Sequence, residues 1–368
     1  MKTASLKKLF LINYAPPSSS VYKYASEIYE CTSTYSEIIN LQYSNRSKKW
    51  DKTAKGRTFK SPFKKVISAN ILLGRFLFRE AKKYILNNSE KDRIIHYTHQ
   101  TISPFYRDLN RSVVSIHDNP FTALEYGIYN MPKENITDQL SFRIYSHSIR
   151  QNLEKYKRFK YVISTSDYVR NYLIKYGFKN EITTIHPPVA THFTSIKDKV
   201  KLREELNLPI DKKLLLSVTT DQPRKNLNLI EKLLSQLDQS FQLVRVGKPI
   251  LKSINYSGVD PSTINKIYNA CDLLIMPSLE EGYGSPIPEA MTVGTPVVCS
   301  NIEVFHELCG DSAIYFDPYS VNSFADAVKT GINNAEIYRD KGMKRSLNFS
   351  YQRFCAEISK YYAERFFK

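Results

Sequence analysis

The amino-acid sequence predicts an α/β chain of two domains, each built on a parallel β-sheet. Three observations support this prediction. Short β-branched runs alternate with helical stretches along most of the chain, and the 368 residues exceed what one typical core organises. The alternation pauses once, at residues 182–213, where a Pro pair, a polar run and Pro209 indicate a hinge.

In the first half, strands are expected where apolar runs end in polar residues. The run "KLFLINYAPP" is stopped by a Pro pair, as is typical of a buried parallel strand. The following "SSSVYKYASEIYECTS" starts with serines suited to helix capping and predicts a helix. Further strands are expected at "RIIHYTH", "SVVSIHD" and "YVISTSD", and a helix at "DQLSFRIYSHSIRQNLEKYKRF".

The second half repeats the alternation after the hinge. Strands are expected at "KLLLSVTT", "FQLVRVG", "DLLIMPS", "PVVCS" and "SAIYFDP", and helices from about Asn226, from Pro261 and from Pro286. We expect one Rossmann-like domain at 1–195 and a second at 196–349. The aromatic-rich helix at 350–368 is expected to pack on one of them, and a return to the first is the candidate arrangement.

Composition limits the partners and the compartment. The formal net charge of +17 suits nucleic acid, anionic lipid or phosphorylated small molecules, or reflects a lysine-rich proteome. Five scattered cysteines without a CxxC spacing favour a reducing, cytoplasmic location and argue against disulfides or a zinc site. The first residues read as a strand rather than a signal peptide. No apolar run approaches the ~18 residues of a membrane span.

The stretch "LEEGYGSPIPEAMTVGTPVV", residues 279–298, places two carboxylates around a loop and a helix start. Pro286 suits the first helical turn, and the backbone N–H groups near Gly284 and Ser285 would face an anion at the positive end of the helix dipole. Glu281 and Glu289 could accept hydrogen bonds from sugar and ribose hydroxyls. The structural alternative is one helix-start acid and one exposed loop acid.

This stretch resembles the E-G-F-G-x-P-x-x-E signature of glycosyltransferase family 4, the retaining nucleotide-sugar transferases with the GT-B fold. Tyr283 stands where the family usually has Phe. The resemblance implies two Rossmann-like domains whose parallel sheets face each other across a cleft. It also implies roles in donor and nucleotide binding, with Glu281 on the donor sugar and Glu289 on the ribose. The same loop contributes Gly282, Tyr283, Gly284, Ser285 and Pro286.

Other segments extend the resemblance. "LLLSVTTDQPRKNLNLI" resembles the family's V-G-T-x-x-P-R-K-N segment, which makes Arg224 and Lys225 the diphosphate clamp, and "FQLVRVGKPI" adds Gly247 and Lys248 on the nucleotide side. "SVVSIHDNPF" resembles the strand ending in His-Asp, which makes His117 the histidine that faces the donor sugar. The segment 301–318 resembles the family's E-x-x-G-D-A-A-x-x-x-D-P.

The first loop departs from the family. Many relatives have glycines there, but this chain has "YAPPSSSVYKYA". Ser18, Ser19 and Ser20, which offer hydroxyl and N–H groups, are the candidates for an acceptor or phosphate loop. The resemblance spans about residues 90–365 and is strongest in the second half.

The resemblance implies that a hexose moves from a nucleoside-diphosphate sugar with retention of the anomeric configuration, without a bound metal or cofactor. GDP-mannose is the favoured donor and UDP-glucose the next. The acceptor is expected to be a glycan or a lipid-linked sugar in cell-surface polysaccharide, glycolipid or protein-glycan assembly. Glu281, His117, Arg224 and Lys225 are the expected catalytic group, and the leaving phosphate is expected to take the acceptor proton.

Residues 46–83 contain 13 Lys or Arg and only Asp51 and Glu80 as acids. Apolar residues occur among these charges at roughly helical spacing, which suits an interfacial helix on the inner, anionic face of the cell membrane. The alternative is an ordinary surface helix. No zinc finger, RNP-like string or glycine loop supports a nucleic-acid partner.

Two other function classes stay open. One is another enzyme of the same fold, a sugar-nucleotide epimerase or hydrolase, or a phosphorylase, although the sequence shows no pyridoxal-phosphate lysine. The other is a non-catalytic module that binds a nucleotide sugar or a glycan. Donor hydrolysis without acceptor would separate an enzyme from such a module.

Overall fold

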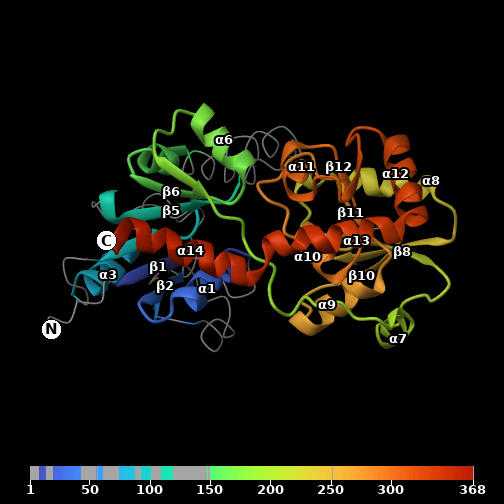
Figure 1. Cartoon of the computed structure of the whole chain (residues 1–368), viewed down its shortest axis with the longest axis horizontal. Coiled ribbons are helices and arrows are strands. Elements are labelled where there is room, and N and C mark those ends of the chain that lie inside the picture. The colour runs from blue at the N-terminus through green and yellow to red at the C-terminus, as the bar shows by residue number, and fades with distance from the viewer. Residues whose placement is uncertain are drawn as a thin grey trace. The chain divides into compact units, whose positions relative to one another are not determined.

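The chain is described by a computed structural model that places most residues from 8 to 367. The described ranges are 8–13, 20–42, 55, 57–60, 74–87, 93–100, 109–118, 147, 150–250 and 252–367. The chain divides into two compact units (Figure 1). Unit 1 comprises Met1–His186 with Phe354–Lys368, and unit 2 comprises Pro187–Arg353. The division falls inside the segment 182–213 that the sequence indicates as a hinge.

The described residues of unit 1 form a seven-stranded parallel sheet in the order β3-β2-β1-β4-β5-β6-β7. Its strands are β1 (Leu9–Asn13), β2 (Ser36–Gln42), β3 (Arg57–Lys60), β4 (Ile94–Tyr97), β5 (Ser112–Ile116), β6 (Tyr161–Ser164) and β7 (Glu181–Thr184). Helices among its described residues include α1 (Ser20–Thr32), α3 (Gly74–Asn87), the 3-10 turn η1 (Leu109–Arg111), α6 (Asp167–Lys175) and α14 (Tyr351–Phe366), and residues 150–156 are helical as well. The α14 helix begins at the end of unit 2.

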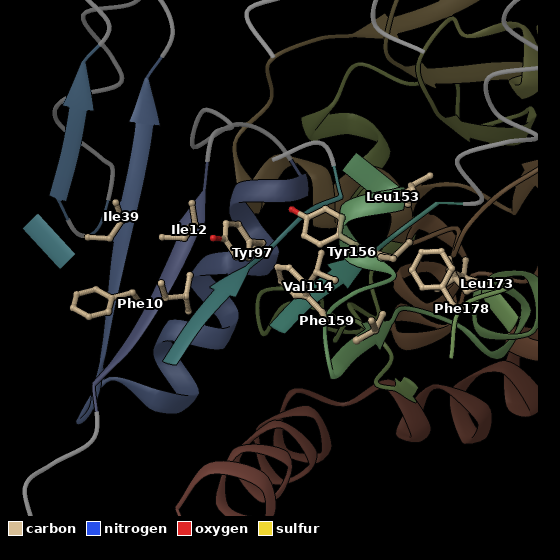
Figure 2. Close-up of a cluster of buried hydrophobic side chains, with 14 of the residues drawn as sticks. Phe10, Ile12, Ile39, Tyr97, Val114, Leu153, Tyr156, Phe159, Leu173 and Phe178 are labelled. Atoms are coloured by element: carbon tan, nitrogen blue, oxygen red, sulfur yellow. The ribbon is translucent and has the colours of Figure 1, made fainter. Parts of the chain in front are cut away.

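The sheet of unit 1 has an apolar core on each face. Along β1, Phe10 and Ile12 belong to one core, whereas Leu9 and Leu11 belong to the other. Successive side chains of a strand point to opposite faces, so a strand that is buried on both faces is apolar throughout. This explains the uninterrupted run that predicts β1. Figure 2 shows the first core, where Tyr97 lies near the rings of Tyr156 and Phe159.

The C-terminal helix α14 covers the second face of the unit 1 sheet. Its buried residues Phe354, Ile358 and Tyr362 pack in the same core as Leu9 and Leu11. Fully burying an aromatic or aliphatic side chain of this size contributes about 1.5–3 kcal/mol. Unit 1 is therefore completed by a segment that lies more than 160 residues further along the chain than His186.

A disulfide joins the same two parts of unit 1. Cys31, near the end of α1, is bonded to Cys355 in α14, 324 residues away in sequence. The sequence-based expectation that the chain has no disulfides is therefore wrong. Sequence spacing gave no sign of the pair because the two helices meet only through the packing of α14 on the sheet. The other three cysteines, Cys271, Cys299 and Cys309, are free and buried.

Unit 2 has a six-stranded parallel sheet in the order β10-β9-β8-β11-β12-β13. Its strands are β8 (Lys213–Val218), β9 (Phe241–Val246), β10 (Ser253–Tyr256), β11 (Leu273–Met276), β12 (Val297–Ser300) and β13 (Ala313–Phe316). Its α-helices are α7 (Lys199–Glu205), α8 (Leu227–Gln236), α9 (Pro261–Ala270), α10 (Pro286–Val293), α11 (Glu303–Cys309), α12 (Val321–Asn333) and α13 (Ala335–Ser346), and its 3-10 turns are η2 (Pro223–Lys225) and η3 (Leu347–Phe349). The two parallel sheets with their helices confirm the predicted α/β class.

Local sequence explains where the predicted helices of unit 2 start and stop. Asp260 caps α9 by accepting hydrogen bonds from the backbone N–H groups of Ser262 and Thr263, and Pro261 occupies the first turn. The α10 helix starts at Pro286 and ends at Gly294, whose φ of +86° is the left-handed conformation that glycine adopts readily. Both starts agree with the sequence-based prediction.

Four strands carry no clear sequence signal. The strands β2, β3, β7 and β10 are absent from the elements expected above, and β7 lies inside the predicted hinge segment. Three of them, β3, β7 and β10, are edge strands of the described sheets, where one side of the strand has no neighbour, and β2 lies next to β3. The residues of β7 and β10 are half-buried or exposed, so they lack the apolar runs that mark the central strands.

Candidate functional site

The two predicted acids of the 279–298 stretch differ in their surroundings. Glu281 follows β11 and is 4% exposed. Its carboxylate accepts hydrogen bonds from Arg224 Nη1 at 2.8 Å, from Lys225 Nζ at 2.5 Å and from Ser278 Oγ at 2.8 Å. We call Glu281, Arg224, Lys225 and Ser278 the charged cluster. The two residues of the predicted clamp and the first predicted acid thus meet at one point in unit 2.

The pKa of Glu281 reflects this environment. Burial by itself would raise the pKa of the carboxyl group, but the charges of Lys225 and Arg224 act in the opposite direction. Hydrogen bonds from Lys225 and Ser278 add to their effect, and the net result is a pKa lowered to about 2. Glu281 is therefore ionised at every physiological pH, and it suits the role of hydrogen-bond acceptor rather than that of proton donor.

The loop that carries the clamp is attached to the loop that carries the acid. Arg224 and Lys225 end the short turn η2, after β8, and Asn226 continues the chain in the left-handed conformation with φ of 55°. The backbone N–H of Leu279 donates to the carbonyl of Arg224 at 2.8 Å, and Arg224 Nη1 donates to the carbonyl of Glu280 at 3.0 Å. The β8 and β11 loops are therefore fixed against each other by backbone as well as by charge.

The loop between Glu281 and α10 is shaped by a glycine at a position where a side chain would be strained. Gly284 has φ of +94°, and a Cβ there would lie 2.9 Å from the ring of Phe305. The Ile287 N–H donates to the Gly284 carbonyl at 3.0 Å and starts α10. Ser285 is exposed at the N-terminus of α10 and forms no side-chain capping hydrogen bond. Gly282 and Pro286 complete the loop.

Tyr283, a predicted donor-binding residue, lies in the framework of this loop. Its hydroxyl donates to the carbonyl of Pro187 at 2.8 Å, and its ring meets that of Phe349 edge-on. The side chain is 7% exposed. In this structure Tyr283 connects the loop to the first and last segments of unit 2.

Glu289, the second predicted acid, lies in the first turn of α10 and is half-buried. Its Oε2 accepts a hydrogen bond of 2.7 Å from the hydroxyl of Tyr268, a fully buried residue of α9. This contact fixes one carboxylate oxygen of Glu289. Neither Tyr268 nor Ser278 has a signal in the sequence, because their contacts with the two acids depend on how separate segments meet.

Gly247 and Lys248 follow β9, which pairs with β8. Gly247 has φ of +146°, and a Cβ there would lie 2.4 Å from the carbonyl oxygen of Thr219, so the ends of β8 and β9 approach closely at this point. The Lys248 ammonium group is exposed and pairs with Asp221 at 2.9 Å. Both predicted residues therefore border the loop that leads to Arg224.

His117 lies in unit 1, directly after β5. Its Nε2 is 2.8 Å from the carbonyl oxygen of Thr98, so this nitrogen carries the proton, and its backbone N–H donates to Gln100 Oε1. The ring of Tyr24 contacts the imidazole edge-on, with centroids 4.5 Å apart. Burial lowers the pKa of His117, while the hydrogen bond to Thr98 and the charge of Asp118 partly oppose that effect. A neutral imidazole results at pH 7.

Some predicted features lie outside the described residues. Ser18 and Ser19 are outside them, and Ser20 is described only as the first residue of α1. Of the basic stretch 46–83, the structure describes residue 55, the strand β3 and the first part of α3. Within the described ranges, no helix is both long and apolar enough to cross a membrane, and no group of three or more His, Cys, Asp or Glu could hold a metal ion.

A family match lies in unit 2. Residues 198–345 match the family described as Glycosyl transferases group 1. This range contains both predicted acids, the charged cluster and Gly247 with Lys248. The motifs that carry the resemblance in the second half of the chain therefore lie within the matched residues.

Curated relatives extend the similarity beyond unit 2. The O-antigen chain mannosyltransferase B of Escherichia coli is 26% identical over 282 residues, which are 66% of this chain and 68% of that protein. The next relatives are matched over between 21% and 51% of their own length. The chain therefore spans about half or less of those proteins.

Solved structures show the fold over almost the whole chain. A sucrose-phosphate synthase from Thermosynechococcus elongatus has a TM-score of 0.76 at 16% identity and covers 97% of this chain and 99% of its own. The Anabaena protein Alr3699/HepE, solved in complex with UDP and glucose, has a TM-score of 0.74 at 15% identity and covers 97% and 100%. At such low identity the similarity establishes the fold alone.

Proposed function

We propose that this chain moves a hexose from a nucleoside-diphosphate sugar to a glycan or lipid-linked acceptor with retention of configuration. The premise is that the chain is a glycosyltransferase of the GT-B fold with a glycosyl transferases group 1 domain. The observation that carries this proposal is the charged cluster of Glu281, Arg224, Lys225 and Ser278 in unit 2. Its groups match the demands of a diphosphate that leaves from a sugar.

The clamp residues stabilise the leaving group in this proposal. As the bond between the sugar and the diphosphate breaks, negative charge develops on the phosphate oxygens. Arg224 offers a planar set of donors and Lys225 a compact charge, and both are already fixed in a largely buried place. One preorganised donor of this kind contributes about 2.7–4 kcal/mol to transition-state stabilisation, by analogy with oxyanion-hole deletions. In this proposal the two cations neutralise the charge of the leaving diphosphate, as a divalent metal ion does in other transferases. The proposed reaction is therefore metal-independent.

The two acids position the donor. Glu281 is ionised, so it accepts hydrogen bonds from hydroxyls of the donor sugar, and Glu289 accepts them from the ribose. Neither acid acts as a covalent nucleophile, and the leaving phosphate takes the proton of the acceptor hydroxyl. The neutral imidazole of His117 in unit 1 offers a polar contact to the donor sugar without adding charge.

GDP-mannose is the proposed donor, with UDP-glucose as the alternative. The first choice rests on the relative that is named as a mannosyltransferase of the O-antigen chain. The second rests on the structural neighbour that was solved with UDP and glucose. The same relative supports an acceptor in cell-surface glycan assembly. We also propose that the basic stretch 46–83 holds the protein at the inner face of the membrane. The disulfide between Cys31 and Cys355 removes the cysteine argument for a reducing compartment.

A thermal-shift panel tests the proposal. We expect one of GDP, UDP, ADP and CDP to raise the Tm of the wild type, because a ligand at one hundred times its Kd stabilises the fold by about 2.7 kcal/mol. The same nucleotide should have less effect on Glu289→Ala, whereas Glu303→Ala, which removes another acid from the first turn of a helix in unit 2, should respond as the wild type does. No shift with any nucleotide, in folded protein, would count against the proposal.

A donor-hydrolysis assay separates the remaining classes. Slow release of mannose or glucose from the donor that the panel identifies is expected from a transferase without its acceptor, and the released sugar should keep the anomeric configuration. The release should persist in excess EDTA. Nucleotide binding without any turnover, even with added glycan acceptors, would favour the non-catalytic module.

A further inference from the structure

Arg245, in β9, is a large side chain with no exposed surface. Its guanidinium group donates three hydrogen bonds, to Ser217 Oγ at 3.0 Å, to the Thr219 carbonyl at 3.0 Å and to the Lys248 carbonyl at 2.6 Å. All three acceptors are neutral oxygens. The guanidinium therefore brings a positive charge into unit 2 without a carboxylate among its hydrogen-bond partners.

The other buried arginine of unit 2 is held differently. Arg203, in α7, donates to carbonyl oxygens but also to the carboxylate of Asp272, at 2.7 Å. Asp272 accepts in turn from the backbone N–H of Leu214, near the start of β8. Arg203 thus neutralises a structural acid near the amino end of β8, whereas Arg245 lies where β8 ends. Asp221 is the acid whose charge acts on Arg245, but it forms no hydrogen bond with the guanidinium group. The hydrogen bonds of Arg245 therefore serve to hold backbone and hydroxyl oxygens in place.

The contacts of Arg245 link the two loops that border the proposed diphosphate site. Ser217 and Thr219 lie at the end of β8, and Thr219 comes five residues before Arg224. Lys248 follows the end of β9. The close approach of Gly247 to Thr219 occurs at the same place. Arg245 therefore holds the start of the loop that carries Arg224 and Lys225 against the loop that carries Lys248.

We propose that Arg245 is a positioning residue for recognition of the donor diphosphate. It fixes the path from Thr219 to the clamp residues through its hydrogen bonds, without touching the ligand. This inference rests on the proposed function, since it assumes that a nucleoside diphosphate binds at the ends of β8 and β9.

The test measures the preference for a diphosphate over a monophosphate. Dissociation constants for GDP, GMP, UDP and UMP are measured by calorimetry on the wild type, Arg245→Met and Arg245→Lys. We expect Arg245→Met to weaken binding of the preferred diphosphate at least 10-fold and that of its monophosphate by less than 3-fold. Arg245→Lys keeps the positive charge but loses the planar set of hydrogen-bond donors. Its affinity for the diphosphate should therefore lie between that of the wild type and that of Arg245→Met.

Arg203→Met is the matched control. It removes a buried guanidinium of the same unit together with its ion pair, so its Tm should fall, yet its preference for the diphosphate should stay that of the wild type. An equal loss of diphosphate and monophosphate affinity in Arg245→Met, or the same selective loss in Arg203→Met, would overturn the inference. If Arg245→Met does not fold, Arg245→Lys and Ser217→Ala supply the comparison, with a selective loss of 2-fold or more expected in each.

Failure of the inference and failure of the proposed function give different results. If the wild type binds none of these four nucleotides and none of the diphosphates of the thermal-shift panel, the proposed function falls and this inference falls with it. If the wild type prefers a diphosphate and the Arg245 variants keep that preference, the inference alone is wrong.

Discussion

The two units place different kinds of polar groups near the carboxyl ends of their central strands. In unit 1, His96 Nδ1 lies 2.6 Å from the Tyr362 hydroxyl and Nε2 lies 2.7 Å from Ser115 Oγ, which is 3.1 Å from the Tyr24 hydroxyl. Burial lowers the pKa of His96 to about 3, so this network is neutral. In unit 2, the charged cluster holds ionised groups that are almost as deeply buried.

This difference indicates that the neutral network of unit 1 supports the fold, whereas the charged cluster of unit 2 is suited to binding a ligand. A neutral network of hydroxyls and imidazole satisfies its own donors and acceptors, and here it ties α14, through Tyr362, to the sheet. A buried cluster of charges costs more to assemble, because each ion loses its hydration, and it is useful where an anion exchanges partners with it. The comparison favours donor chemistry in unit 2 and leaves unit 1 with a rigid support for His117.

The substitution with the largest expected effect removes a residue of the charged cluster. Lys225→Ala removes a donor that the proposed reaction needs in the transition state, so kcat should fall by about 10²–10³-fold. The measurement is steady-state transfer with the donor identified by the thermal-shift panel. Lys266→Ala, which removes an exposed ion pair with Glu205 in the same unit, should leave kcat within 2-fold.

A neutral result for Lys225→Ala would have a definite meaning. If kcat stays near the wild-type value while the Tm falls, Lys225 only neutralises Glu281. The charged cluster would then be framework, like the network of unit 1, and the proposed role of the clamp would be wrong.

The second prediction uses the acid titration of unit 2. The carboxyl of Glu281 has a folded-state pKa of about 2 against 4.5 for the ordinary group, so its ionised form stabilises the folded state above pH 4.5. This contribution, on the order of 3 kcal/mol, should be lost as the pH falls from 4.5 toward 2. Urea unfolding of wild type and Glu281→Gln from pH 7 to pH 2.5 should show a stability difference that narrows in that range. A difference independent of pH would contradict the assigned pKa.

Sequence reasoning succeeds best where function depends on short segments of unit 2. The fold class, the central strands and the starts of α9 and α10 follow from apolar runs and from the positions of Pro261 and Pro286. Glu281, Arg224 and Lys225 were named from motifs alone. What could not be predicted from the sequence is that Glu281 accepts hydrogen bonds from both cations, because that depends on how the β8 and β11 loops meet.

Sequence reasoning fails where contacts join distant segments. The pairing of Cys31 with Cys355 and the hydrogen bond of His96 to Tyr362 arise only because α14 packs on the sheet of unit 1. Neither has a local pattern, since each partner resembles an ordinary residue of an amphipathic helix or a strand. The edge strands β7 and β10 were missed for the related reason that half-exposed strands lack an apolar run.

The third prediction concerns the disulfide of unit 1. Reduction, or the pair Cys31→Ser and Cys355→Ser, should lower the free energy of unfolding of unit 1 by about 2 kcal/mol, the lower end of the usual range for a disulfide. The apolar contacts of α14 should keep the helix in place. Thiol-labelling mass spectrometry of the purified protein first establishes the bond. Hydrogen exchange should then become faster in α1 and α14 on reduction and stay unchanged in α8 to α10, and uniform change in both units would contradict the local role.

The smallest expected effect concerns Tyr268, which lies under Glu289. Tyr268→Phe keeps the buried ring and deletes the hydroxyl that donates to Glu289 Oε2, a loss of about 1 kcal/mol for one hydrogen bond. If Glu289 holds the ribose equally in the ground and transition states, KM for the donor should rise about 5-fold with kcat unchanged. Tyr256→Phe is the matched control, because it deletes a hydroxyl that donates to the Leu206 carbonyl in the same unit. A lower kcat at constant KM would instead mean that the Glu289 contact tightens only in the transition state. Glu289 would then contribute to transition-state stabilisation together with the charged cluster.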